Sequence, residues 1–251
     1  MLKSTPRELQ LARPGPRGVL DTVAFDDVDA ASMALGEPAV DPGPELRALF
    51  NPFTAAAEQF RTLRSQLSLH MGAPVAGRGQ VLAVVGAERG VGRSFVAVNL
   101  AVSMAQRGGR VLLVDADLRH PRLHRLFGLR AADGLAAMLD GSADHRSVRA
   151  VAPLPALHLL GAGVPPVHPL ELVERPEFAL VMCQLRLRFS HIVLDTPAAC
   201  DGPDAAIVSA NADGALLVVQ RHRSEMAALQ RLQQALHLAG TAVVGAVDNA
   251  H

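Results

Sequence analysis

The chain has 251 residues, 49% of them hydrophobic, and its 24 Lys and Arg side chains equal its 24 Asp and Glu side chains in number. A neutral balance excludes the global positive field that draws proteins to nucleic acid or to anionic membranes. No signal peptide is visible and no window reaches the roughly 18 to 20 apolar residues of a membrane span, so we expect a cytoplasmic protein. Cys183 and Cys200 lack metal or redox spacing, and we expect small buried side chains there.

Residues 1–50 differ in composition from the rest of the chain. They contain many prolines and glycines and a cluster of acids at Asp26, Asp27 and Asp29. Because such a segment buries too little apolar surface to fold, we predict a largely disordered N-terminal arm. Residues 51–251 are long and apolar enough to form one domain with a sizeable core.

An amphipathic helix is predicted at the start of this domain, over residues 54–71. Its apolar positions Phe60, Leu63 and Leu67 recur at helical spacing. A second, charged stripe lies away from them and consists of Glu58, Arg61 and Arg64. Two interpretations stay open for the charged stripe: a solvated helix face, or a contact with another subunit.

A glycine-rich loop at residues 86–94 follows a short apolar run at 81–85 and precedes an apolar helix at 95–106. Strand, loop and helix in this order are typical of a phosphate-binding loop. Small residues such as Gly90 and Gly92 let consecutive backbone N–H groups close around phosphate oxygens, and the helix presents its positive dipole end to the anion.

The loop matches the pattern G-x-x-x-x-G-K-[ST] only at Gly92 and Ser94. Ala87 takes the first glycine position, and Arg93 takes the lysine position. On this loop alone, an ordinary turn between a strand and a helix is an equal alternative. Lys3 is the only lysine of the chain. Arginine at position 93 is not a conservative replacement for lysine, because its charge is spread over a planar guanidinium whereas lysine carries a point charge.

Two further buried strands end in carboxylates. The apolar run at 110–114 is followed by Asp115 and Asp117, and the run at 191–194 by Asp195. Buried carboxylates are costly unless they meet cations or hydrogen-bond donors, and an aspartate after a buried strand is typical of Mg²⁺ sites that bind nucleotides.

The remaining elements alternate between strands and helices, which predicts an α/β fold with a mostly parallel central sheet flanked by helices. The other predicted elements are strands at 156–160, 215–219 and 242–247, a helix at 177–189, and a helix capped by Ser224. In such a sheet the carboxyl ends of the strands form the edge at which ligands bind. The loop and the three acids therefore favour one phosphate site.

The run from Val111 to Pro121, VLLVDADLRHP, resembles the second acidic motif of the bacterial tyrosine kinases of exopolysaccharide biosynthesis. These are cytoplasmic ATPase partners of chain-length determinant proteins. The likeness covers residues 51–251. Further matching segments are the E-x-x-R-x-x-R helix at 58–64, then 122–128, Asp195-Thr196-Pro197, 204–205 and 245–249.

The resemblance implies a P-loop NTPase fold with a deviant Walker A motif, binding ATP or ADP with Mg²⁺. The implied nucleotide-binding residues are Glu88, Arg89, Gly90, Val91, Gly92, Arg93, Ser94, Phe95 and Asn249, the last reading the base edge. The implied metal-binding residues are Ser94, Asp115 and Asp195. The implied catalytic residues are Arg93, Asp115 and Asp117, and the implied subunit contacts are Glu58, Arg61 and Arg64.

The same resemblance implies a homo-oligomer without nucleic acid or a membrane span of its own, peripheral to the inner membrane through a chain-length determinant (copolymerase) protein. Two departures from the family pattern stand out: Arg93 replaces the lysine, and the chain contains no tyrosine, so self-phosphorylation on tyrosine is impossible. One alternative is therefore a catalytically degenerate, nucleotide-binding regulatory subunit. Another is a partitioning or septum-positioning ATPase, although Glu88 occupies the position of that class's signature lysine.

Overall fold

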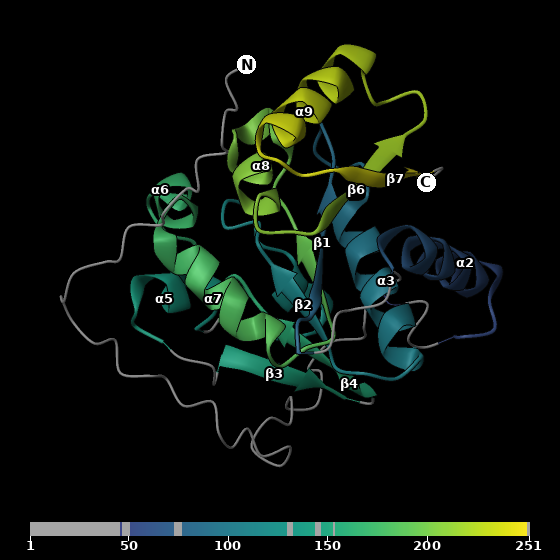
Figure 1. The fold of residues 1–251 in the computed structure, drawn as a ribbon, viewed down its shortest axis with the longest axis horizontal. Coiled ribbons are helices and arrows are strands. Elements are labelled where there is room, and N and C mark those ends of the chain that lie inside the picture. The colour runs from purple at the N-terminus through teal and green to yellow at the C-terminus, as the bar shows by residue number, and fades with distance from the viewer. Residues whose placement is uncertain are drawn as a thin grey trace, which may run out of the picture.

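The computed structural model describes residues 46, 51–72, 77–129, 133–143, 147–152 and 154–249. Its centre is a seven-stranded sheet with the order β3-β4-β2-β5-β1-β6-β7 (Figure 1). The strands are β1 (Gln80–Val85), β2 (Val111–Asp115), β3 (Val148–Val151), β4 (Leu154–Leu160), β5 (His191–Asp195), β6 (Gly214–Gln220) and β7 (Val243–Asn249). Every neighbouring pair is parallel except β3 and β4. The predicted α/β fold with a mostly parallel sheet is confirmed.

Helices cover both faces of the sheet (Figure 1). They are α2 (Ala55–Met71), α3 (Arg93–Gln106), α4 (Leu123–Leu126), α5 (Leu135–Asp140), α6 (Pro169–Val173), α7 (Pro176–Arg186), α8 (Asp204–Ser209) and α9 (Met226–Leu238), with a 3₁₀ turn η4 (Ala199–Asp201). In β1, Val81, Ala83 and Val85 pack towards α5 to α9, whereas Leu82 and Val84 pack towards α2 and α3. The strand is apolar at successive positions because both of its faces are buried.

Helix α2 begins after Thr54, whose hydroxyl accepts the N–H of Ala57. Its buried face includes Phe60, as its periodicity predicts. Arg64, however, does not lie on a separate charged face: its Nη1 donates to the carbonyl of Ser103 on α3 at 2.5 Å. The prediction that all three charged residues share a face away from the core is wrong for Arg64, whose long side chain bridges two packed helices.

Several local predictions are also corrected. Ser224 does not cap α9, because its hydroxyl accepts the N–H of Gln220, and the helix begins one residue after Glu225. Cys183 and Cys200 are exposed rather than buried, the first on the outer side of α7 and the second in η4.

The predicted disordered arm, residues 1–50, lies outside the described residues except for Leu46, which is buried in the core. Across the described ranges, we find no helix that is both long and apolar enough to cross a membrane.

Candidate nucleotide and metal site

The glycine-rich loop leaves the carboxyl end of β1 and enters α3 with two left-handed residues. Gly90 has φ 77° and Gly92 has φ 97°, values that side chains other than glycine rarely adopt. A Cβ atom at Gly92 would lie 2.1 Å from Nδ2 of Asn249. Gly92 is also the N-cap of α3, and no side chain caps the helix. Its first N–H groups therefore remain available to an anion.

A pocket of about 350 Å³ opens in front of this loop. Its size falls within the range of roughly 300 to 1,000 Å³ that is usual for small-molecule sites. The residues that line it are Arg89, Gly90, Gly92, Arg93, Ser94, Phe95, Asp117, His120, Arg122 and Asp201. The predicted loop residues and a predicted acid thus share one cavity at the carboxyl edge of the sheet.

The predicted acids meet at the same edge. Strands β2 and β5 are neighbours, and Asp115 is the register partner of Asp195. One oxygen of Asp115 accepts the N–H groups of Arg122 at 3.0 Å and Leu123 at 2.9 Å. Asp117 accepts the N–H of His120 at 2.8 Å. The backbone that follows β2 is therefore folded around these carboxylates, which partly offsets their burial.

The two facing carboxylates have raised pKa values. Burial, followed by the nearby charge of Asp195, raises the pKa of Asp115 well above its usual range. Burial raises the pKa of Asp195 to about 6, against the opposing effects of a hydrogen bond from Ser94 and the charge of Arg93. Two like charges placed this close in a dry site destabilise each other, so the site favours a cation or a proton.

One oxygen of Asp115 and one of Asp195 are buried and accept no hydrogen bond from the part of the chain that the structure describes. Carboxylate and hydroxyl oxygens are the ligands that Mg²⁺ prefers, and Mg²⁺ is usually held by one or two carboxylates together with phosphates and water. Within the residues that the structure describes, no cluster of three or more His, Cys, Asp and Glu side chains could hold a metal alone. The donor set therefore fits a Mg²⁺ ion that arrives with a nucleotide.

Replacing Asp195 by asparagine is expected to stabilise the nucleotide-free protein at pH 7.5. Folding raises the pKa of Asp195 from 3.8 to about 6. The contribution of this carboxyl group to the free energy of unfolding is therefore fully present below pH 3.8 and is lost as the pH rises through 6, where the buried group must ionise. Each pKa unit corresponds to about 1.4 kcal/mol, and we expect a gain on the order of 2 kcal/mol, or about 4 to 8 °C in melting temperature.

Thermal unfolding of the parent and Asp195→Asn at pH 7.5 and pH 5 checks this expectation. The difference in melting temperature between Asp195→Asn and the parent should be smaller at pH 5, because Asp195 of the folded parent is largely protonated there. Asp140→Asn, an exposed carboxylate at the end of α5, is the matched control and should show no comparable gain. A gain for Asp195→Asn that is equal at both pH values would contradict the assigned electrostatic cause.

Arg93 is buried, with 9% of its surface exposed, and is tied to the protein by two hydrogen bonds. Its Nε donates to the carbonyl of Thr196 at 3.0 Å, and its Nη1 donates to the carbonyl of Glu88 at 2.6 Å. The guanidinium thus links the loop after β1 to the loop after β5. Its charge lies near Asp195, where it opposes the effect of burial.

The other predicted loop residues hold the loop in place. Glu88 accepts the N–H of Glu225 at 2.9 Å, and Arg89 forms an ion pair with Asp201 at 2.7 Å. The Asn249 amide donates to the carbonyl of Val91 at 2.9 Å, so it lies against the loop, and its predicted role in reading the base stays a prediction.

Three pocket residues, His120, Arg122 and Asp201, were not predicted from the sequence. His120 and Arg122 stand directly after the acids, and that adjacency was the available signal. Asp201 reaches the pocket only because the loop after β5 lies beside the P-loop, where Cys200 donates its N–H to Ala87.

Comparison with known proteins agrees with this geometry. A family model described as ParA, NUBPL iron-transfer P-loop NTPase, matches residues 78–153. The chain is 30% identical over 202 residues to the tyrosine-protein kinase YwqD of Bacillus subtilis, a match that covers 80% of this chain and 84% of that protein. It is 35% identical to the putative tyrosine-protein kinase EpsB of Ralstonia solanacearum, covering 79% of this chain and 26% of that protein. The chain spans about a quarter of the length of several such relatives.

Among solved structures, the kinase domain of the Escherichia coli tyrosine kinase ETK is similar, with a TM-score of 0.77 and 28% identity over 84% of this chain and 81% of that one. The match to YwqD extends over most of both proteins. The chain therefore belongs to the family of bacterial tyrosine-protein kinases, with their P-loop NTPase fold.

Proposed function

We propose that this chain is a kinase-like ATPase that binds ATP or ADP with Mg²⁺ and transfers the γ-phosphoryl group to a tyrosine of another protein. The observation that carries the proposal is the meeting of Asp115, Asp117 and Asp195 with a left-handed glycine loop at one sheet edge. Relatives that bear the name tyrosine-protein kinase support the transfer. Because these 251 residues contain no tyrosine, the acceptor tyrosine lies outside them.

In this proposal the chain's own residues bind and neutralise charge. The N–H groups of the loop and of the first turn of α3 bind the phosphates. Ser94, Asp115 and Asp195 would hold Mg²⁺, which supplies charge neutralisation on the phosphate oxygens when bound. Asp117 lies at the pocket wall with one oxygen fixed by the N–H of His120. Such a site works by positioning and electrostatics rather than by covalent chemistry.

The proposed setting is exopolysaccharide biosynthesis, at the cytoplasmic face of the inner membrane. There the chain would work with a membrane chain-length determinant (copolymerase) protein. The motifs at 58–64 and 111–121 support this setting through their resemblance to kinases of that system. The name of the relative EpsB is consistent with it.

The activity is tested by incubating the protein with Mg²⁺, ATP labelled at the γ-phosphate and a synthetic tyrosine peptide. The reaction is run with and without the cytoplasmic segment of a chain-length determinant protein from the same organism. Labelled phosphotyrosine in the peptide, dependent on Mg²⁺ and reduced in Asp117→Asn, is expected. Label that appears only as inorganic phosphate under both conditions would contradict the kinase proposal.

A second candidate function is that of a regulatory subunit that binds nucleotide without turning it over. The two hydrogen bonds that fix the Arg93 guanidinium to Thr196 and Glu88 favour it, because a fixed cation cannot follow the γ-phosphate through the reaction. In that case Mg-ADP binds with ordinary affinity, and no labelled phosphotyrosine forms even with the membrane segment present.

We also propose that α2 contributes to a homo-oligomer. Arg61 pairs with Glu58 within α2 and is partly exposed, so its charge remains available to a neighbouring subunit. Arg61→Glu is expected to weaken assembly at least about tenfold through like-charge repulsion across the interface. Arg64 is unsuited to this test because it bridges to α3.

Light scattering over a concentration series measures the change in assembly. Arg231→Glu, an exposed arginine on α9, is the matched control and should assemble as the parent does. Identical mass distributions for Arg61→Glu and the parent would remove α2 from the interface.

A further inference from the structure

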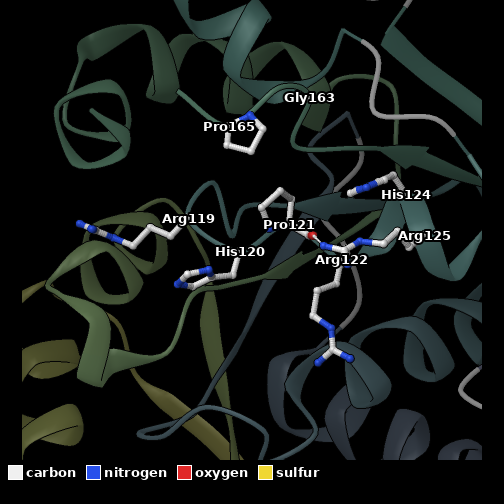
Figure 2. Close-up of a pocket in the computed structure, with 8 residues that line it drawn as sticks. All are labelled: Arg119, His120, Pro121, Arg122, His124, Arg125, Gly163 and Pro165. Carbon is white, nitrogen blue, oxygen red and sulfur yellow. Dashed lines mark hydrogen bonds between the residues drawn. The ribbon is translucent and has the colours of Figure 1, made fainter. Parts of the chain in front are cut away.

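A second pocket, of about 410 Å³, lies directly beside the nucleotide pocket. Figure 2 shows the residues that line this second pocket. The residues that line it are Arg119, His120, Pro121, Arg122, His124, Arg125, Gly163 and Pro165. Two of them, His120 and Arg122, also line the nucleotide pocket, so the two cavities share a wall. Residues 119–125 form one side of this second pocket and are called the basic segment here. In Figure 2, Gly163 and Pro165 lie across from the basic segment, on the other side of the pocket.

The basic segment is held rigidly by the acids of the neighbouring site. Asp117 accepts the N–H of His120, and Asp115 accepts the N–H groups of Arg122 and Leu123. Because these hydrogen bonds fix the backbone, the side chains that line the second pocket are presented without a large ordering cost. Asp115 and Asp117 therefore fix the backbone that carries one side of this pocket.

The lining of the pocket carries positive charge and no carboxylate. Arg119 is neutralised by a two-pronged ion pair with the buried Asp204, at 2.9 and 3.0 Å. Arg122 and Arg125 form no ion pair among the residues that the structure describes, although the charge of Arg122 also acts on Asp195 in the neighbouring site. Burial and the charge of Arg125 lower the pKa of His124, which disfavours its charged form. The charge thus comes from two guanidiniums, which match carboxylates well.

The rim of the pocket is apolar. Val164 stands between the lining residues Gly163 and Pro165 and is 70% exposed, and Val167 in the same loop is 88% exposed. A free phosphate or a second nucleotide would leave these side chains uncovered, and the left-handed glycine of this pocket, Gly163, is not the N-cap of a helix as Gly92 is in the nucleotide site. A peptide with acidic and apolar residues would contact both the guanidiniums and the rim.

We propose that this pocket binds the phosphoryl acceptor itself, a segment of another protein in which acidic residues flank the tyrosine. The proposal rests on the kinase function proposed above and names its substrate class. The position of the pocket beside the nucleotide pocket, across the wall formed by His120 and Arg122, brings such a segment next to the phosphate-binding loop. Because residues 1–251 contain no tyrosine, the segment does not come from among them.

The test measures peptide binding separately from phosphoryl transfer. A fluorescent synthetic peptide with one tyrosine between glutamates, and a matched peptide with glutamines, are titrated with the full chain in saturating Mg-ADP, with anisotropy as the readout. We expect the glutamate peptide to bind about tenfold more tightly than the glutamine peptide, and this difference to shrink as salt is raised.

Arg125 supplies the decisive variant because it is exposed and does not line the nucleotide pocket. Arg125→Glu should weaken binding of the glutamate peptide by about tenfold and leave both the glutamine peptide and Mg-ADP unchanged. Arg125→Gln should give a smaller loss in the same direction. Arg231→Glu on α9 is the matched charge reversal elsewhere on the surface and should have no effect.

Three outcomes overturn the inference alone: equal affinity for the two peptides, unchanged affinity in Arg125→Glu, or complete displacement of the peptide by inorganic phosphate but not by sodium chloride of equal ionic strength. The last would make the pocket a small-anion site. Failure to bind Mg-ADP at all would instead overturn the proposed function, so the two failures are distinguishable.

Discussion

Arg93→Lys is expected to raise the rate of phosphoryl transfer, to water or to an added tyrosine peptide, on the order of 10² to 10³-fold. This is the usual effect of restoring one contact that stabilises the transition state but not the bound substrate. In the parent, the guanidinium is fixed by the carbonyls of Thr196 and Glu88. A lysine ammonium is a compact charge on a flexible stem that can leave such carbonyls and follow the γ-phosphate. Affinity for Mg-ADP should stay within a few fold, because the loop N–H groups and Ser94 are unchanged.

The comparison measures turnover at saturating ATP, with and without the cytoplasmic segment of the chain-length protein. Arg89→Lys is the matched control, because Arg89 lines the same pocket but is largely exposed and pairs with Asp201. It should change turnover little. Equal rates for the parent and Arg93→Lys would mean that Arg93 is a working substitute for lysine and that the degenerate-site interpretation fails.

Gly92→Ala is expected to weaken Mg-ADP binding by about 10 to 100-fold. Gly92 has φ 97°, and a Cβ atom there would lie 2.1 Å from the Asn249 amide, so the loop must move. Losing one or two hydrogen bonds to charged phosphate, at about 1.5 to 3 kcal/mol each before relaxation, accounts for a loss of this size. A positive φ at alanine also destabilises the fold by on the order of 1 kcal/mol.

Calorimetric titration gives the affinity, and two variants separate the causes. Gly141→Ala is the matched control, because Gly141 has φ 81° and an added Cβ there meets no atom within 4 Å. It should destabilise the fold without affecting nucleotide. In an Asn249→Ala background, which lacks the amide that the added Cβ would meet, Gly92→Ala should cost less affinity than it costs in the parent. Unaltered Mg-ADP affinity in Gly92→Ala would show that the loop does not bind the phosphates.

The edge of the sheet that carries the site was predictable because it depends on short-range patterns. Apolar runs buried on both faces marked β1, β2 and β5, and parallel strands bring their carboxyl ends to one edge. Asp115 and Asp195 accordingly became register partners. Gly90 and Gly92, which were expected from the sequence to give the loop its conformational freedom, take positive φ, and phosphate binding by the loop stays a prediction.

Several short elements were not predictable in the same way. Strand β3 has four residues and pairs antiparallel at the edge of the sheet, and α4, α5, α6 and α8 each have six residues or fewer. Segments of this length contain too little periodicity to stand out, and tertiary packing decides them.

Contacts between distant loops were the other limit. The ion pair of Arg89 with Asp201 and the carbonyl of Thr196 that holds Arg93 join segments more than 100 residues apart. No local pattern encodes such pairings. The bridge from Arg64 to Ser103 is a further example: helical spacing placed Arg64 on the outer face, whereas the packing of α2 on α3 determined its partner.

We propose that the loop after β1 and the acids that follow β2 and β5 form one Mg²⁺-dependent nucleotide site. Isothermal titration of Mg-ADP into the purified chain, repeated with EDTA and with Asp195→Asn, tests it most directly. One binding event per chain that weakens when Mg²⁺ is chelated and when Asp195 is replaced is the predicted result. Absence of binding, or binding that neither EDTA nor Asp195→Asn alters, would contradict the account.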